Sequence, residues 1–231
     1  MNISDIIGHH RLINVAQKYH ICRNCKYVDD SPARLTVGSP CPVCGVPSPG
    51  GLTFFDLSVL MMVELLQDAY VAIPEVPDEE LDPLTSRKSV HSASVVIVFC
   101  TLKELLLERL LSALMDAQHI PDRVRSRLFA DNNSHSQRLT KLFPALACQT
   151  WDEAVAAIDT VGSSSFNSIS AFMKRITDIR NEFIHEGSSF AINKTLAVDS
   201  LKAFVPMMNL HIHLHNKLVH PSYVGGKPTT A

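Results

Sequence analysis

Cys22-Arg23-Asn24-Cys25 and Cys41-Pro42-Val43-Cys44 are two Cys-x2-Cys pairs separated by fifteen residues. Each pair can present two thiolates to one metal ion, and two pairs complete the tetrahedral shell that zinc prefers. Gly45 follows the second pair and allows a tight backbone bend around a sulfur ligand. The pattern predicts a structural zinc site, because four thiolates leave no open position for a substrate. Two disulfides or four free thiols are the alternatives.

The segment around these cysteines is rich in turn residues and too short to bury a core of its own. Residues 20–53 predict a zinc ribbon with two knuckles and short strands, which would fold on its metal. The Ser48-Pro49-Gly50-Gly51 stretch is typical of a linker. We therefore expect residues 1–53 to form an N-terminal segment that contains the ribbon. An amphipathic stretch over 6–19 predicts a short helix at its start.

Beyond the ribbon, apolar residues recur at helical spacing almost to the C-terminus. This spacing predicts helices over 55–72, 90–118, 121–130, 137–148, 151–159, 164–186 and 192–218. Asp56 or Ser58 is expected to cap the first of them. Residues 73–83 contain three prolines and five acids, which predicts an exposed loop. The predicted fold is mainly α, with a helical bundle over 54–221, a small N-terminal zinc ribbon and a flexible tail over 222–231.

Length and composition suit one medium domain and one small one. The chain has 231 residues, 46% of them hydrophobic, and a formal net charge of −2. This charge argues against a cationic surface for tight, nonspecific nucleic-acid binding, although a local basic cleft is compatible with it. The start of the chain lacks the pattern of a signal peptide. The most hydrophobic run of the chain, 95–99, is followed by charged residues at 103, 104, 108 and 109, so it is too short to span a membrane. We expect a soluble, cytoplasmic protein without a membrane partner. The reducing conditions of that compartment suit zinc thiolates better than disulfides.

A second motif, Arg180-Asn181-Glu182-Phe183-Ile184-His185, ends the predicted helix over 164–186. It resembles the Arg-x4-His motif of the HEPN superfamily. Members are small helical bundles, and many are metal-independent ribonucleases of toxin–antitoxin, phage-defence and RNA-processing systems. Asn181 is a residue type that the family prefers after the arginine, and one more helix follows the motif here as it does there. The resemblance covers roughly residues 55–220 by helix pattern, but only the hexapeptide is specific.

The resemblance implies a homodimeric endoribonuclease that needs no metal for cleavage and leaves 2′,3′-cyclic phosphate and 5′-hydroxyl ends. Arg180 would stabilise the phosphate, His185 would act as acid or base, and Asn181 would position them. Glu104 is a supporting candidate for holding Arg180. The residue types suit this chemistry, because imidazole titrates near neutral pH and guanidinium binds phosphate oxygens. RNA would be the substrate, and an antitoxin or regulatory protein would be a further partner.

The spacing within the motif bears on how a site could form. Arg180 and His185 are five residues apart, about 140° around an ideal helix, so they do not share a face. They converge only if the helix distorts or ends, or if a second copy completes the site. Asn181 and His185 are four residues apart and do share a face.

The motif also has a structural interpretation. Arg180 could pair with Glu182 or Asp178 on a solvated face, and His185 could interact as a cation with the helix C-terminus. The alternative function is a non-catalytic HEPN-like and zinc-ribbon module that binds a partner protein, a nucleotide or nucleic acid.

Other residue groups predict less. The last helix carries several histidines, which we interpret as surface or partly buried side chains rather than metal ligands: His211, His213, His215 and His220. A basic cluster could line an RNA-binding surface or a solvated face: Arg123, Arg125 and Arg127, with Arg138 and Lys141. Cys100 and Cys148 lie in apolar surroundings and are expected to be buried thiols.

Overall fold

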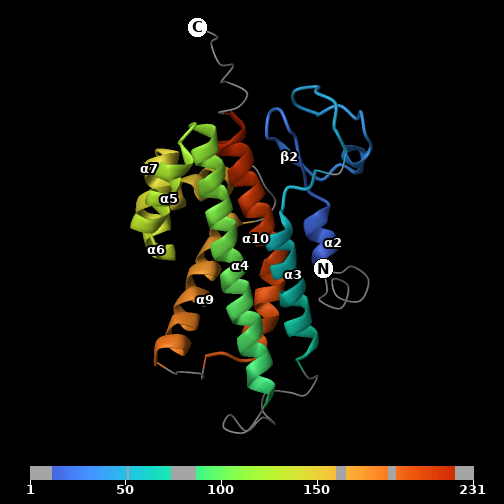
Figure 1. Cartoon of the computed structure of the whole chain (residues 1–231). Coiled ribbons are helices and arrows are strands. Elements are labelled where there is room, and N and C mark those ends of the chain that lie inside the picture. The colour runs from blue at the N-terminus through green and yellow to red at the C-terminus, as the bar shows by residue number, and fades with distance from the viewer. Residues whose placement is uncertain (1–11, 51, 74–86, 160–164, 187–190, 222–231) are drawn as a thin grey trace. The chain divides into compact units, whose positions relative to one another are not determined.

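The computed structural model describes residues 12–50, 52–73, 87–159, 165–186 and 191–221 (Figure 1). These residues are mainly helical, as the sequence predicts, and the chain divides into two compact units. Unit 1 consists of residues 1–16, 55–103 and 168–208, and unit 2 consists of residues 17–54, 104–167 and 209–231. The domain boundaries expected at 53 and 221 stay a prediction. The predicted tail over 222–231, and most of the loop predicted over 73–83, lie outside the described residues.

Unit 1 contains α2 (Leu12–Gln17) up to residue 16, α3 (Leu57–Val71) and parts of α4 (Arg87–Ala117), α9 (Phe166–Glu186) and α10 (Lys194–Leu218). Asp56 is the N-cap of α3, and its carboxylate accepts a hydrogen bond of 3.1 Å from the Val59 backbone N–H. One of the two predicted caps is therefore confirmed. The Leu12 backbone N–H donates to Gln67 of α3 over 2.7 Å, which holds α2 against α3.

Helix α3 is apolar on almost every side, but it buries only one of its faces. Val59, Val63 and Leu66 are fully buried. Leu57 and Met61, on the opposite face, are 72% and 55% exposed.

Helix α4 is buried around much of its circumference. Its buried apolar side chains are Val95, Val96, Phe99, Cys100, Leu102, Leu106, Leu107, Leu110, Leu111, Leu114 and Met115. Within the part of the chain that the structure describes, Val90–Ala117 of α4 alone is long and apolar enough to cross a membrane. Of its apolar window, 56% is buried, and a core helix of a soluble protein meets the same criteria. The cytoplasmic location stays a prediction.

Unit 2 combines residues 17–54, which we call the ribbon, with α5 (Asp122–Asp131), α6 (His135–Gln137), α7 (Phe143–Ala147), α8 (Trp151–Asp159) and the remaining parts of α4, α9 and α10. In the ribbon, β1 (His20–Ile21) and β2 (Val28–Asp29) pair antiparallel, with His20 opposite Asp29. The short strands predicted for the ribbon are confirmed.

Helical backbone covers the helix predicted over 137–148, from His135 to Ala147, but its α-helical hydrogen bonding is interrupted. A π-helical turn over Arg138–Leu142 separates α6 from α7. Pro144 lies in the first turn of α7 and has no N–H to donate to a carbonyl four residues earlier. The Phe143 N–H instead reaches Arg138 O, five residues back, which is the π-helical bond.

Candidate functional site

The four predicted ligands, Cys22, Cys25, Cys41 and Cys44, come together in unit 2. Their sulfur atoms all lie within 4.8 Å of one another. The Sγ–Sγ distance is 3.6 Å between Cys22 and Cys44 and 3.7 Å between Cys25 and Cys41. A tetrahedron with the usual zinc–sulfur bond length has edges of about 3.8 Å. All four are free of disulfide bonds, so the cluster can hold one metal ion such as zinc.

The two cysteine pairs form knuckles with matching backbone hydrogen bonds. In the first, the Cys22 N–H donates to Tyr27 O and the Lys26 N–H donates to Cys22 O, over 2.8 and 3.0 Å. The second knuckle repeats this pattern, from Cys41 to Val46 O and from Gly45 to Cys41 O, over 3.0 and 2.9 Å. Lys26 and Gly45 occupy equivalent positions and both have left-handed backbone, with φ of 61° and 72°.

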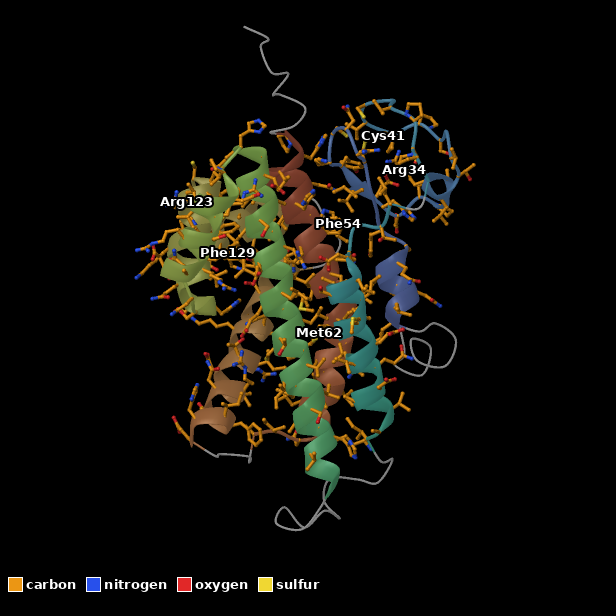
Figure 2. The ribbon with its side chains drawn as sticks, viewed as in Figure 1. Arg34, Cys41, Phe54, Met62, Arg123 and Phe129 are labelled. Atoms are coloured by element: carbon orange, nitrogen blue, oxygen red, sulfur yellow. The ribbon has the colours of Figure 1, made fainter. Side chains whose placement is uncertain are left out.

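Burial shapes the acidity of these thiols. It raises the pKa of Cys25 and Cys41. Burial also acts to raise the pKa of Cys44, but hydrogen bonds with the Val46 backbone, Asn24 and neighbouring cysteines lower it to about 6. A bound cation would stabilise the thiolates that burial disfavours. The ribbon also buries Arg34, whose Nε lies 3.4 Å from Asp29 Oδ2 (Figure 2).

Side chains from the C-terminal part of α10 hold the first knuckle within unit 2. Asn216 accepts from the Val28 N–H over 2.9 Å and donates to Val28 O over 2.8 Å, as a neighbouring strand would. His215 Nε2 donates to Lys26 O, and His220 Nδ1, just beyond the helix, donates to Cys25 O, each over 2.9 Å. The sequence indicated the histidines but not this role, because it depends on contacts 188 to 195 residues apart.

Two of the four histidines that the sequence predicts to be surface or partly buried are fully buried core residues. His211 and His215 are each 3% exposed. The His211 ring lies 5.9 Å from that of Trp151, and the His215 ring lies 4.9 Å from that of Phe54. Among the described residues, the only group of three or more potential metal ligands is the cysteine cluster, so a histidine metal site gains no support.

Replacement of His215 by Gln is expected to weaken the dependence of stability on pH. Burial lowers the pKa of His215 to about 4, from an ordinary value of 6.5. Because the unfolded chain takes up the proton first as the pH falls, the folded state loses stability from pH 6.5 down to about 4. This loss reaches about 2 kcal/mol by pH 5. Gln can still donate to Lys26 O but does not titrate.

Urea unfolding of wild type and His215→Gln, in saturating zinc from pH 7.5 to 5, measures this difference. Any release of zinc at low pH is common to both proteins. The difference between their slopes of unfolding free energy against pH therefore measures the contribution of His215. Parallel stability curves for the two proteins would show that His215 does not contribute.

The predicted catalytic residues lie in the last two turns of α9. Arg180 and Asn181 are half-buried and His185 is exposed. Asn181 and His185 lie one turn apart, and α10 begins eight residues after α9 ends. Glu104 is half-buried on α4, and its predicted contact with Arg180 stays a prediction.

Lys103 anchors α9 to α4 one turn before the motif. Lys103 is only 2% exposed, although it is a charged residue within the longest apolar helix. Its ammonium donates to the Thr177 hydroxyl and, over 3.5 Å, to Met173 O. Thr177 lies four residues before Asn181, on the same side of α9. A single buried lysine on an otherwise apolar face gives no periodic signal in the sequence.

The basic cluster is largely neutralised. Arg125 contacts Asp116 and Asp122, Arg127 lies 3.0 Å from Asp131, and Arg138 lies 2.9 Å from Glu108. Arg123, labelled on α5 in Figure 2, and Lys141 are exposed. The cluster as a whole is therefore a weak candidate for an RNA surface.

The two remaining cysteines differ in exposure. Cys100 is buried as predicted, whereas Cys148 is exposed, which corrects that expectation. Cys148 is the C-cap of α7 and has a left-handed backbone. Because the helix ends there, the Cys148 side chain does not continue the apolar face of the helix.

Searches against protein-family models, curated proteins and solved structures found no match to this chain.

Proposed function

We propose that this chain is a homodimeric, metal-independent endoribonuclease of HEPN type with a structural zinc ribbon. The observation that carries the proposal is the placement of Arg180, Asn181 and His185 in the last two turns of α9. His185 is open to solvent, and a second long helix follows. The substrate is RNA, the location is the cytoplasm, and a toxin–antitoxin or defence setting follows from the resemblance. An antitoxin or regulatory protein would restrain such an enzyme.

The proposed reaction needs two proton transfers and one group that stabilises the negative charge on the phosphate oxygens. The 2′-oxygen of the RNA loses its proton to a base and attacks the adjacent phosphorus, and the bond from phosphorus to the 5′-oxygen breaks. The leaving 5′-oxygen takes a proton from an acid. His185 performs one of these transfers, because an imidazole can give or accept a proton and this exposed side chain can reach a phosphodiester. Arg180 binds the phosphate oxygens as negative charge builds on them.

The shape of α9 supports a dimer as the form of the proposed enzyme. The motif lies within continuous helix up to Glu186, so Arg180 and His185 stay about 140° apart around the axis. One copy therefore does not direct both groups at one phosphate, and a symmetric partner would supply the complement. Asn181, one turn before His185, is placed to orient the imidazole by a hydrogen bond.

Zinc has no place in the reaction itself under this proposal. Cys22, Cys25, Cys41 and Cys44 would hold the ion, and a closed shell of four thiolates supplies folding energy rather than a reactive water. The ribbon would then present a fixed surface to RNA or to a partner protein.

The test is an RNA cleavage assay with purified wild type and His185→Ala, on total RNA and on tRNA. EDTA is added after folding, and the zinc content of each protein is measured again after the assay. We expect cleavage by wild type and a loss of 10²- to 10⁴-fold in His185→Ala. Equal cleavage by both proteins would remove His185 from the site. No cleavage by either protein, with a folded dimer demonstrated, would favour the non-catalytic interaction module.

A further inference from the structure

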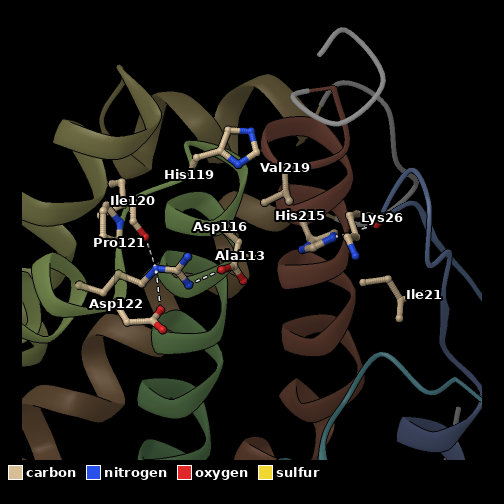
Figure 3. Close-up of a pocket in the computed structure, with 11 residues that line it drawn as sticks. Ile21, Lys26, Ala113, Asp116, His119, Ile120, Pro121, Asp122, His215 and Val219 are labelled. Atoms are coloured by element: carbon tan, nitrogen blue, oxygen red, sulfur yellow. Dashed lines mark hydrogen bonds and ion pairs between the residues drawn. The ribbon is translucent and has the colours of Figure 1, made fainter. Parts of the chain in front are cut away.

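A cavity of about 690 Å³ lies within unit 2, where the first knuckle meets α4, the start of α5 and α10 (Figure 3). Its volume falls within the usual range for small-molecule sites, about 300–1,000 Å³. All of its lining residues belong to unit 2. None of them is a proposed zinc ligand or part of the Arg180–His185 motif.

Two lining residues have a backbone conformation that favours glycine. Among the described residues, Lys26, His119 and Cys148 are the non-glycine residues with positive φ, and the first two line this cavity. Lys26 has φ of 61° at the knuckle position that Gly45 occupies in the second knuckle. An L-residue with a side chain is strained in this region, and such strain is concentrated at functional sites.

His119 repeats this conflict at the end of α4. The Ile120 N–H donates to Met115 O and the His119 N–H donates to Asp116 O, each over 3.0 Å, which is the closing pattern of a Schellman motif. Glycine is the usual residue at the left-handed position of that motif, which His119 occupies with φ of 55°. At both positions, local structure favours Gly and the chain instead places a polar side chain at the cavity.

The cavity has three chemically distinct parts (Figure 3). Lys26 provides a cation beside Ile21, and its ammonium donates to Arg23 O over 3.0 Å. At the other side, Arg125 contacts the carboxylates of Asp116 and Asp122 and donates to Ile120 O over 2.6 Å. Between these parts lie the apolar side chains of Ala113 and Val219 and the ring of His215, whose Nε2 donates to Lys26 O.

The parts match the chemistry of a nucleotide. A phosphate suits the cation, a flat base suits the apolar wall, and carboxylate oxygens accept hydrogen bonds from the amino groups of bases. The formal charges of the lining residues sum to zero, so a purely anionic ligand such as free phosphate fits less well than a ligand that also carries hydrogen-bond donors.

We infer that this cavity binds one nucleotide unit of RNA, with Lys26 on the phosphate, His119 as a second donor, and Asp116 and Asp122 on the base. The choice of RNA as the ligand rests on the proposed function. The cavity is a binding site outside the Arg180–His185 motif, and it makes the first knuckle part of substrate recognition.

Glycine substitutions test this inference sharply, because they are expected to weaken RNA binding without lowering the stability of the fold. The parent is full-length, zinc-loaded His185→Ala protein, so that RNA is not consumed. Lys26→Gly relieves the backbone strain and removes the cation, and His119→Gly does the same for the imidazole. Lys202→Ala is the matched control, since it removes one exposed lysine that lies outside the cavity and outside the basic cluster.

Binding is measured by fluorescence anisotropy with a labelled twelve-nucleotide single-stranded RNA of mixed sequence, and melting temperatures are measured in parallel. We expect Lys26→Gly to weaken binding about 3- to 10-fold and to lower the slope of log affinity against log salt by about 0.7. His119→Gly is expected to weaken binding less, and neither variant melts below the parent. Competition with inorganic phosphate and with 5′-AMP separates phosphate binding from nucleotide binding, and we expect only 5′-AMP to compete at millimolar concentration.

Four results would overturn the inference: no binding of RNA by the parent, unchanged binding in Lys26→Gly, an equal loss in Lys202→Ala, or a lower melting temperature in Lys26→Gly. Competition by phosphate as strong as that by 5′-AMP would reduce the cavity to an anion site and would also overturn it. A wild type that fails to cleave RNA, while binding still depends on Lys26, would defeat the nuclease proposal and leave this inference standing.

Discussion

Removal of zinc is expected to unfold the ribbon and to release one ion per chain. The buried cluster at the metal site consists of Cys22, Cys25 and Cys41, with Tyr27 and Cys44 packed against it, so the cysteines themselves make up most of it. Structural zinc contributes on the order of 10 kcal/mol to the folding of such small segments. Hydrogen exchange should become fast at amides that are bonded within the knuckles, such as those of Cys22 and Cys41.

The matched variants for this prediction are Cys41→Ser and Cys148→Ser. Cys41 lies in the cluster, whereas Cys148 is exposed and lies outside it. Cys41→Ser should bind zinc weakly and lose protection over the ribbon, and Cys148→Ser should behave like wild type. Full protection of the ribbon in zinc-free protein would show that the cluster is not a structural metal site.

Replacement of Arg180 by Ala is expected to lower kcat by about 10²- to 10³-fold, because the charge on the phosphate loses its main stabilising group. Arg180→Lys should recover part of the rate, since Lys keeps the charge but not the planar fork. Arg180 is half-buried, so the melting temperature of each variant is measured with its kinetics. Unchanged kcat in a folded Arg180→Ala dimer would contradict the assigned role.

A mixture of inactive copies tests whether each site needs two chains. In a mixed dimer of Arg180→Ala and His185→Ala, one of the two composite sites keeps both groups intact. Random re-association should therefore restore about one quarter of wild-type activity. No recovery, with subunit exchange demonstrated by mass spectrometry, would mean that each site is contained in one chain.

Local patterns in the sequence predicted most of the helices and the metal cluster. Asp56 predicted the start of α3 because an N-cap acts within three residues, and the cysteine spacing predicted the cluster because each knuckle is a local turn. The helix predicted over 164–186 ends at the same residue as α9, Glu186.

Contacts between distant segments could not be predicted in this way. Asn216 meets Val28 across 188 residues, and Lys103 meets Thr177 across 74. No periodicity in a single sequence encodes these pairs, because each depends on how helices pack. The left-handed backbone at Lys26 and His119 was missed for a different reason: the residue types suggest no turn, and only the structure reveals the conflict.

The ends of the RNA products test the central claim most directly. Wild-type protein is incubated with tRNA in EDTA, and the new termini are identified by mass spectrometry, with His185→Ala as the control. The proposed chemistry predicts 2′,3′-cyclic phosphate and 5′-hydroxyl ends from wild type and no new ends from the variant. Ends with 3′-hydroxyl and 5′-phosphate, or new ends of any kind from His185→Ala, would contradict the assignment of this motif as the reaction site.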